Sequence, residues 1–240
     1  MTACLRTLTL LALAALLAAC ASTPTATLGE LPRTPQASIE ELLQQASTSQ
    51  PLEAANLRLA AADKAYKSND NGQAARILEQ VKIDSLLPAQ QIFASTLQAE
   101  LALARNKPKT ALKALNHPSM ERLSELPVEQ QVRTQLVRVK ALAATGQSLQ
   151  AARERIFIAP LLSGSAGNAN HQAIWALIDS LSTSQLQSSG DSDLDGWLAL
   201  ARAAKSTGTP EQQQAAIDAW REKNPQHPAA QSLPEQLNQL

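Results

Sequence analysis

Three turn signals recur at nearly even intervals in the middle of the chain. They are centred on Gly72, Lys107 and Gly146, so the spacings are 35 and 39 residues. A longer stretch of helical periodicity precedes each turn, and a shorter one follows it. This period is typical of stacked helix-turn-helix units of the tetratricopeptide kind. The sequence therefore predicts an all-α fold in which tetratricopeptide-like helical repeats stack as a short superhelix, with an irregular helical bundle as the alternative.

Apolar residues that recur every three or four positions mark the expected helices. The five stripes are Leu52, Ala55, Leu59, Ala62 and Tyr66; Phe93, Leu97, Leu101 and Ala104; Val132, Leu136, Val139 and Ala143; Ile174, Leu177, Ile178 and Leu181; and Trp197, Leu198, Ala201 and Ala204. Ser38 and Glu41 stand at the two positions of a capping box that would open the first helix. Residues 163–170 are expected to form a loop, and Pro210 suits the first turn of the helix that reaches Trp220. No segment has the pattern of a strand.

The composition agrees with closely packed helices. Hydrophobic residues make up 44% of the chain but aromatic residues only 2%, so the core must consist mainly of Ala and Leu. Small side chains allow helices to approach closely, and such a composition argues against a sandwich or a barrel. The chain has 21 basic and 21 acidic residues. Because no basic face is apparent, nucleic acid is not expected as a partner.

The first twenty residues have the pattern of a bacterial lipoprotein signal. Arg6 provides a positive charge, residues 8–17 are apolar, and small residues lead directly into Cys20. The apolar run is too short for a comfortable membrane-spanning helix, and a secretory signal is removed from the mature protein. A lipoprotein signal requires cysteine at the cleavage point, because its thiol receives the lipid. We therefore expect residues 1–19 to be removed and Cys20 to be lipidated; the alternative is an ordinary signal peptide with a chance cysteine, like Cys4.

The residue after the lipidated cysteine indicates the destination of the protein. In Gram-negative bacteria an aspartate there often retains a lipoprotein in the inner membrane, so Ala21 favours the outer membrane, with the body facing the periplasm. Attached lipid chains would provide durable anchoring. No cysteine follows Cys20, so the mature chain cannot form an internal disulfide and must be stabilised by packing.

The mature chain divides into a tether, a body and a short tail. Residues 20–37 are expected to be a lipidated cysteine and flexible tether, because prolines lie among Ser and Thr without a hydrophobic period. Residues 21–37 would reach roughly 55–60 Å if fully extended. We expect the tetratricopeptide-like helical domain over residues 38–232. Residues 233–240 are expected to begin a linker to a C-terminal domain that is missing from this chain.

The sequence has no constellation typical of catalysis or metal binding. His117, His171 and His227 lack a second His, Cys or carboxylate at ligand spacing, so they are expected to be solvated or capping residues. Nucleophile elbows, phosphate-binding loops and dinucleotide fingerprints are absent. No cofactor, no metal and no small-molecule substrate is therefore predicted, and the protein is not expected to be an enzyme.

One enzymatic alternative involves Glu100. Some periplasmic lytic transglycosylases combine a helical superhelix with a single acidic residue in a groove. A glutamate on the polar side of an amphipathic helix is the ordinary outcome, however, and six aromatic residues are few for a saccharide-binding cleft. We therefore expect Glu100 to be a solvated side chain.

The tryptophans allow two interpretations. Trp175, Trp197 and Trp220 are candidate anchors of a protein interface, where this residue type is enriched. Each also lies at helical spacing from an aliphatic residue, namely Ile174, Leu198 and Ile217. This spacing favours core packing.

The C-terminal part of the sequence resembles a known family. The residues that carry the resemblance are Trp220-Arg221-Glu222-Lys223-Asn224-Pro225-Gln226-His227-Pro228-Ala229-Ala230, followed by Leu233-Pro234. Together with the cysteine signal, the tether and the Ala/Leu-rich helical repeats, this segment resembles the N-terminal part of the LpoA family. Members of that family are outer-membrane lipoprotein activators of a class A penicillin-binding protein. The resemblance covers essentially the entire chain.

The resemblance implies a non-enzymatic regulator of peptidoglycan synthesis. Such proteins reach from the outer membrane to the synthase and stimulate its glycan-polymerising and peptide-crosslinking activities. The family normally continues into a second domain, similar to type I periplasmic binding proteins, that carries much of the synthase contact. This chain is then expected to supply the anchor, the spacer and an interaction scaffold. The alternative is a helical-repeat adaptor of another outer-membrane assembly machinery, such as one that inserts porins. The resemblance assigns no functional residue besides Cys20.

Overall fold

The computed structural model describes residues 27–33, 36–206 and 208–239. All regular secondary structure in these ranges is helical, which confirms the predicted all-α class. Cys20 and the signal sequence lie outside the described residues. No helix in the described ranges is both long enough and apolar enough to cross a lipid bilayer.

Three helix pairs form the repeats that the turn spacing predicts. The longer helices are α2 (Pro51–Lys67), α4 (Pro88–Ala104) and α6 (Val128–Ala144), each of 17 residues. The shorter helices are α3 (Asn71–Leu78), α5 (Pro108–Ala114) and α7 (Ser148–Ile158). The longer helices begin at residues 51, 88 and 128, so successive repeats are 37 and 40 residues apart.

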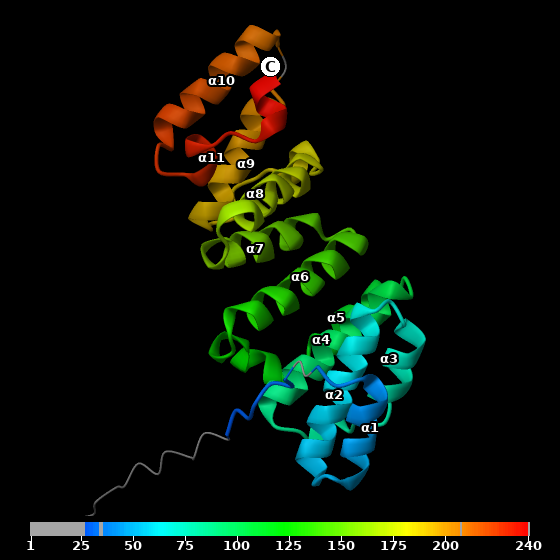
Figure 1. Ribbon diagram of the computed structural model, residues 1–240. Coiled ribbons are helices and arrows are strands. Elements are labelled where there is room, and N and C mark those ends of the chain that lie inside the picture. The colour runs from blue at the N-terminus through cyan, green and yellow to red at the C-terminus, as the bar shows by residue number, and fades with distance from the viewer. Residues whose placement is uncertain (1–26, 34–35, 207, 240) are drawn as a thin grey trace, which may run out of the picture.

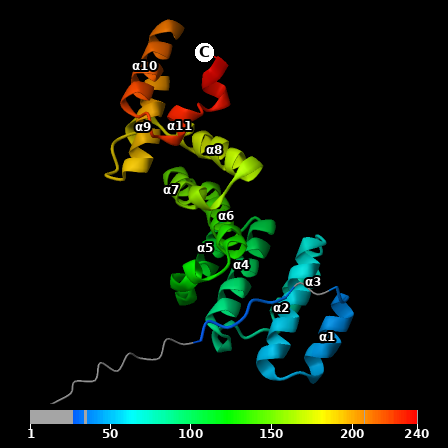
Figure 2. The ribbon, with the colours of Figure 1, turned by 60° about the vertical axis from the view of Figure 1, so that its left-hand side comes forward.

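The remaining elements precede, connect or follow these pairs. Helix α1 (Ile39–Thr48) packs on α2. After the repeats come α8 (Gly164–Asp179), α9 (Ser192–Ala204), α10 (Pro210–Lys223) and α11 (Pro228–Gln231). Short 3₁₀ helices are η1 (Ile83–Ser85), η2 (Pro118–Glu125), η3 (Ala159–Leu161), η4 (Thr183–Gln185) and η5 (Glu235–Gln239). Figure 1 shows α1 to α5 at one end of an elongated molecule, α6 and α7 in the middle and α8 to α11 at the other end, and in the turned view of Figure 2 α6 and α7 again lie between the two ends.

The turn inside each repeat has one geometry. Two residues after each longer helix, a single residue adopts positive φ: Asn69 at 63°, Asn106 at 57° and Gly146 at 78°. The following N–H then bonds back to the helix, at 2.9 Å in the first repeat, 2.8 Å in the second and 2.9 Å in the third. This pattern is a Schellman-type helix end. The first turn is therefore centred on Asn69 and not on Gly72, which lies inside α3.

Two predicted helix starts are confirmed. The amide of Glu41 donates to Oγ of Ser38 at 3.1 Å, and the amide of Ser38 donates to Oε2 of Glu41 at 2.7 Å. This reciprocal capping box opens α1. At the other end of the molecule, Pro210 is the first residue of α10, and Thr209 caps that helix.

The predicted loop at residues 163–170 is wrong, because α8 already begins at Gly164. The Gly, Ser and Asn residues of this stretch are typical of loops, but a tertiary contact overrides that preference. The side chain of Asn170 is buried, and its Nδ2 donates to the carbonyl of Arg155 at 3.0 Å. Nη1 of Arg155 donates back to Oδ1 of Asn170 at 3.1 Å. The pair fixes the N-terminal half of α8 on α7.

Small side chains lie between the helices of the N-terminal core and allow them to pack closely. Ala61, Ala62, Ala65 and Ala74 have no solvent-exposed surface, so α2 and α3 approach closely. Leu52 departs from its predicted stripe, since it is 44% exposed at the start of α2. The tryptophans belong to the C-terminal core, as their spacing favours: Trp175 and Trp197 are 2% exposed, and Trp220 is 5% exposed.

A candidate protein-interaction surface

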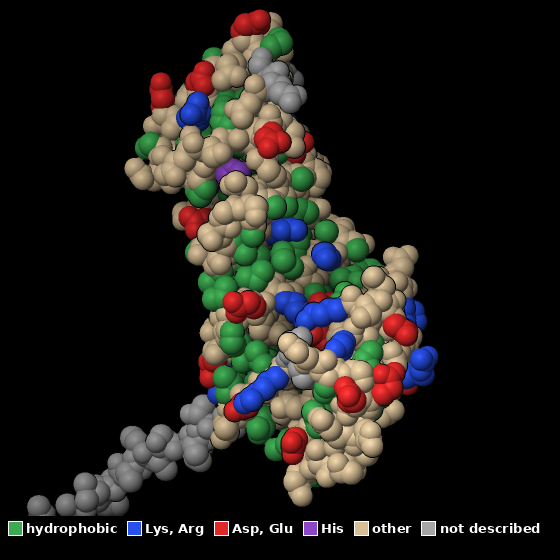
Figure 3. All heavy atoms as spheres, viewed as in Figure 1, with side chains coloured by type: hydrophobic (Ala, Val, Ile, Leu, Met, Phe, Trp, Pro, Cys, Tyr) green, Lys and Arg blue, Asp and Glu red, His purple; other side chains and the backbone are tan. Residues whose placement is uncertain are grey.

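Charged side chains gather near the middle of one face of the molecule. Figure 3 shows Lys and Arg side chains there, with hydrophobic side chains beside them over the region of α6 and α7. Among the described residues no group of three His, Cys, Asp or Glu side chains is arranged to hold a metal ion. Three features of the molecule bear on its use as a scaffold: an ion-pair network on this face, a docked N-terminal segment and a docked C-terminal segment.

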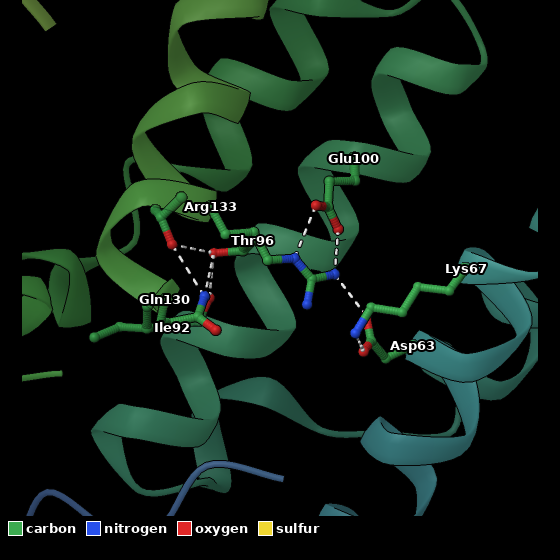
Figure 4. A network of polar contacts seen from close by, with 8 residues as sticks. Asp63, Lys67, Ile92, Thr96, Glu100, Gln130 and Arg133 are labelled. Carbon is green, nitrogen blue, oxygen red and sulfur yellow. Dashed lines mark hydrogen bonds and ion pairs between the residues drawn. The ribbon is translucent and has the colours of Figure 1, made fainter. Parts of the chain in front are cut away.

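Arg133 on α6 ties together the longer helices of the three repeats (Figure 4). Its Nε donates to Oε1 of Glu100 on α4 at 2.9 Å, and its Nη2 donates to Oε2 at 2.6 Å. Nη2 also donates to Oδ1 of Asp63 on α2 at 2.6 Å. The second oxygen of Asp63 pairs with Lys67 at 2.7 Å. One residue from each repeat therefore meets at a single guanidinium.

The network is largely shielded from water. Asp63 and Glu100 are buried, and the side chain of Arg133 is 21% exposed. Its Cζ lies 5.2 Å from the centre of the Phe93 ring, within the range of a cation–π contact. Burial lowers the pKa of Arg133, but the hydrogen bonds and charges of Glu100 and Asp63 outweigh burial, so the pKa is raised overall. The guanidinium is a permanent charge at the junction of the repeats.

This geometry corrects the prediction for Glu100. The residue does not lie on a solvated polar face, because it is 9% exposed and holds Arg133 with both oxygens. A general acid must deliver a proton to substrate within hydrogen-bond reach. Glu100 is instead engaged in a bidentate ion pair inside the helical array. The arrangement suits a structural role.

A second polar cluster joins α4 and α6 next to the ion pairs. Oγ1 of Thr96 lies 2.8 Å from Oγ1 of Thr134, and the Thr96 hydroxyl also contacts the carbonyl of Ile92 at 2.8 Å. Nε2 of Gln130 donates to Thr134 at 3.1 Å. All three polar side chains are buried. Directional bonds of this kind specify how two helices pack, because a displaced helix would leave buried polar groups without partners.

The chain that enters the body is docked over several residues before the first helix. The amide of Ala89, in the first turn of α4, donates to the carbonyl of Leu28 at 2.8 Å. Leu28 and Leu31 pack against buried residues of the repeats. Gly29 has φ +83°, and a Cβ there would lie 2.7 Å from Cβ of Leu87. The predicted flexible tether is therefore too long, since residues 27–33 belong to the folded body.

The C-terminal segment is held by a row of alternating imidazole and indole rings. The ring centres of His171 and Trp197 lie 5.0 Å apart, those of Trp197 and His227 lie 5.2 Å apart, and those of His227 and Trp220 lie 5.2 Å apart. All three contacts have the edge-to-face geometry that aromatic pairs prefer. Nε1 of Trp220 donates to the carbonyl of Gly196 at 3.1 Å. The row fixes α8, α9, α10 and the start of α11 to one another.

His117 and His227 cap helices, which is one of the two roles expected for the histidines. Nδ1 of His227 accepts from the amide of Ala229, and Nδ1 of His117 accepts from the amide of Ser119. Nε2 of His171 donates to the carbonyl of Ser232 at 2.8 Å. Just beyond, Leu237 is buried in the C-terminal core. The described part of the predicted linker is thus packed on the body.

Comparison with known proteins assigns this architecture to a family. The family model of the LppC putative lipoproteins matches residues 32–240. The penicillin-binding protein activator LpoA of Photobacterium profundum is 33% identical over 162 residues, which cover 65% of this chain and 26% of the relative. The activator LpoA of Vibrio cholerae is 27% identical over 241 residues, which cover 98% of this chain and 40% of the relative. The chain thus spans about a quarter to two fifths of these curated relatives.

Solved structures share the same helical fold. The amino-terminal domain of Escherichia coli LpoA superposes with a TM-score of 0.63 at 26% identity, covering 86% of this chain and 93% of that domain. Full-length LpoA of Haemophilus influenzae superposes with a TM-score of 0.59 at 24% identity, covering 84% of this chain and 38% of that protein. Because the Haemophilus influenzae protein is only 24% identical, its likeness supports the fold alone.

Proposed function

We propose that this chain, which belongs to the LppC family of putative lipoproteins, is the anchoring and scaffolding part of an activator of a class A penicillin-binding protein. The observation that carries the proposal is the likeness to the amino-terminal domain of E. coli LpoA, which extends over nearly the whole of that domain. The activator name of the relatives supports the same partner class. A regulator of this kind acts by binding and not by catalysing a reaction.

The proposed anchor is a lipid on Cys20, at the outer membrane and facing the periplasm. The first described residue, Thr27, directly precedes the docked Leu28 and follows Cys20 by seven positions in the sequence. Seven residues span at most about 25 Å when fully extended. The body would then lie close to the lipid surface, nearer than a tether reaching to residue 37 would allow. Distance across the periplasm would come from the length of the helical body.

The proposed mechanism is positional. The Arg133 network and the docked residues 27–33 hold the repeats, and the C-terminal ring row holds α8 to α11, so the body presents a fixed surface to its partner. Association is favoured when little conformational freedom is lost on binding. Glu100 and the histidines serve packing and capping, so the mechanism includes no chemical step on peptidoglycan.

The anchor and the partner are tested together in cells. The chain is expressed with a C-terminal affinity tag, and membranes are separated on a density gradient. The protein should incorporate labelled palmitate, float with the outer membrane and co-purify with a class A penicillin-binding protein after crosslinking. Cys20→Ala should lose the palmitate and leave the outer-membrane fraction. Recovery of porin-insertion components in place of the synthase would contradict the proposed partner and favour the adaptor alternative.

A further inference from the structure

A groove lies between η2, α6 and α7, and Phe157 is part of its lining. Among the described residues, Phe157 is the most exposed large apolar side chain. Phe157 is 67% exposed, compared with 44% for Leu52 and Val128. The groove has a volume of about 390 Å³. Its apolar lining consists of Met120, Leu123, Ile158 and Leu161. An aromatic ring that stands in water beside an apolar hollow is typical of a contact site.

A partly buried carboxyl group lies in the same groove. Glu154 precedes Phe157 by three residues on α7, so both side chains lie on one helix face. Burial raises the pKa of Glu154, and the charge of Arg138 only partly opposes this. Its side chain is half-buried, and it makes no direct hydrogen bond or ion pair with another described residue. Gln135, from α6, lines the groove as well, although its Oε1 is buried below the surface.

The one cation in the lining is already engaged. Arg138 donates through Nη2 to the carbonyl of Leu115 at 2.9 Å. Glu121 adds a second carboxylate to the groove, so the lining carries two acidic groups and one basic group. The groove therefore has an excess of acceptors and of negative charge. Its complement is a hydrogen-bond donor that carries positive charge.

An arginine side chain satisfies all of these features at once. A guanidinium stacks on an aromatic face and donates in a fork to a carboxylate, which a compact ammonium cannot do equally well. A half-buried carboxylate gains more from a charged donor than from a neutral one. Neighbouring aliphatic side chains in the same segment would cover the apolar lining. The charge balance and the exposed ring thus specify the chemistry of the occupant.

We propose that this groove, termed the Phe157 groove, binds an arginine of a partner protein, within a segment that has apolar residues on both sides of it. The guanidinium lies over the Phe157 ring and pairs with Glu154. The flanking apolar residues pack on Leu123 and Leu161. This site is separate from the anchor and from the Arg133 network, and it does not depend on which protein supplies the segment.

The test uses the full chain in detergent micelles and a defined probe. The probe is acetyl-Ser-Leu-Arg-Leu-Ser-amide, and its control replaces arginine by citrulline, which keeps the shape but removes the charge. Nuclear magnetic resonance titration follows the side-chain amide of Gln135. The arginine peptide should bind at least about threefold more tightly than the citrulline peptide. Phe157→Ala and Glu154→Gln should each weaken binding by a similar factor.

A matched variant separates the groove from general hydrophobic exposure. Leu52→Ala also removes an exposed apolar side chain, but at the far end of the repeats, and should leave the affinity unchanged. Equal binding of the two peptides, no shift at Gln135, or equal effects of Phe157→Ala and Leu52→Ala would each overturn the proposal. So would self-association of the chain that is lost in Phe157→Ala without peptide binding, because the occupant would then be a second copy. None of these readouts involves a synthase, so they are independent of the proposed function.

Discussion

Arg133 and Asp63 are separated by 70 residues of sequence, yet Nη2 of the first lies 2.6 Å from Oδ1 of the second. The contact joins the first repeat to the third. Glu100 of the second repeat binds the same guanidinium from the side. Since α2, α4 and α6 are the longer helices of successive pairs, this single side chain couples the relative positions of all three repeats.

Removing the guanidinium should destabilise the N-terminal half of the molecule. Arg133→Ala leaves two buried carboxylates without their cation, and we expect a loss of about 2–4 kcal/mol in the free energy of unfolding. Urea unfolding followed by circular dichroism measures this loss. Arg105→Ala removes an exposed arginine at the end of α4 and should change stability by less than about 0.5 kcal/mol.

Further substitutions distinguish two causes of that loss: the unpaired carboxylates and the lost packing of the Arg133 side chain. Glu100→Gln and Asp63→Asn in the Arg133→Ala background remove the unpaired charges, so they should restore part of the stability. If the triple variant were no more stable than Arg133→Ala, the buried carboxylates would not be the cause.

Gly196 on α9 allows the imidazole of His227 to approach the helix. A Cβ at this position would lie 2.4 Å from Cδ2 of His227. Gly196→Ala should therefore displace the ring and cost about 1–3 kcal/mol. The matched variant is Gly167→Ala on α8, where the nearest atom to the new Cβ is at 3.5 Å. It should stabilise the protein by up to about 1 kcal/mol. Thermal unfolding measures both changes. If Gly196→Ala and Gly167→Ala shifted the unfolding temperature in the same direction, the clash with His227 would not explain the effect.

Gly29 should control the docking of residues 27–33. Gly29→Ala combines an unfavourable φ of +83° with a clash against Leu87. We expect faster hydrogen exchange at the amide of Ala89, whose acceptor is the carbonyl of Leu28. Gly190→Ala has a similar φ of +81° but no atom within 4 Å, so it measures the backbone strain alone. Unchanged exchange at Ala89 in Gly29→Ala would show that this contact does not hold the segment.

His227 should make the C-terminal core sensitive to acid. The pKa of His227 is lowered from its ordinary value of 6.5, chiefly because the ring is buried. The hydrogen bond to the carbonyl of Asp193 and the charge of Asp193 raise the pKa, and the charge of His171 lowers it, but burial outweighs them. The unfolded chain then binds a proton at higher pH than the folded chain. The stabilisation is complete above pH 6.5 and is lost as the pH falls from there through the folded pKa. A proton nuclear magnetic resonance titration that gives His227 a pKa above 6.5 would contradict the expected direction of the pKa shift.

Much of the architecture is predictable from the sequence, because it depends on local signals. Proline at the first position of α2, α4 and α10 marks helix starts, and the Ser38 capping box marks another. The repeat period follows from turn residues. The prediction centres the first turn on Gly72, whereas Asn69 takes the left-handed conformation. Asparagine tolerates that conformation but is a weaker turn signal than glycine.

The remaining differences come from contacts between distant residues. Glu100 has the helical position of a solvated residue, and only Arg133, 33 positions away, makes its burial favourable. The helical start of α8 depends on the pairing of Asn170 with Arg155. Docking of residues 27–33 depends on the packing of Leu28 and Leu31 against the repeats. The groove at Phe157 was also missed, since an unpaired carboxyl group and an exposed ring emerge only after the helices are packed.

The most direct test of the central claim is the affinity of the full chain, in detergent micelles, for a purified class A penicillin-binding protein from the same bacterium. Glycan polymerisation and peptide crosslinking are assayed in the same samples. We expect saturable binding that is lost when the chain is heat-unfolded and weakened when Arg133→Ala disturbs the repeats. Absence of saturable binding, together with unchanged synthase activity at the highest chain concentration, would contradict the proposed role as part of a synthase activator.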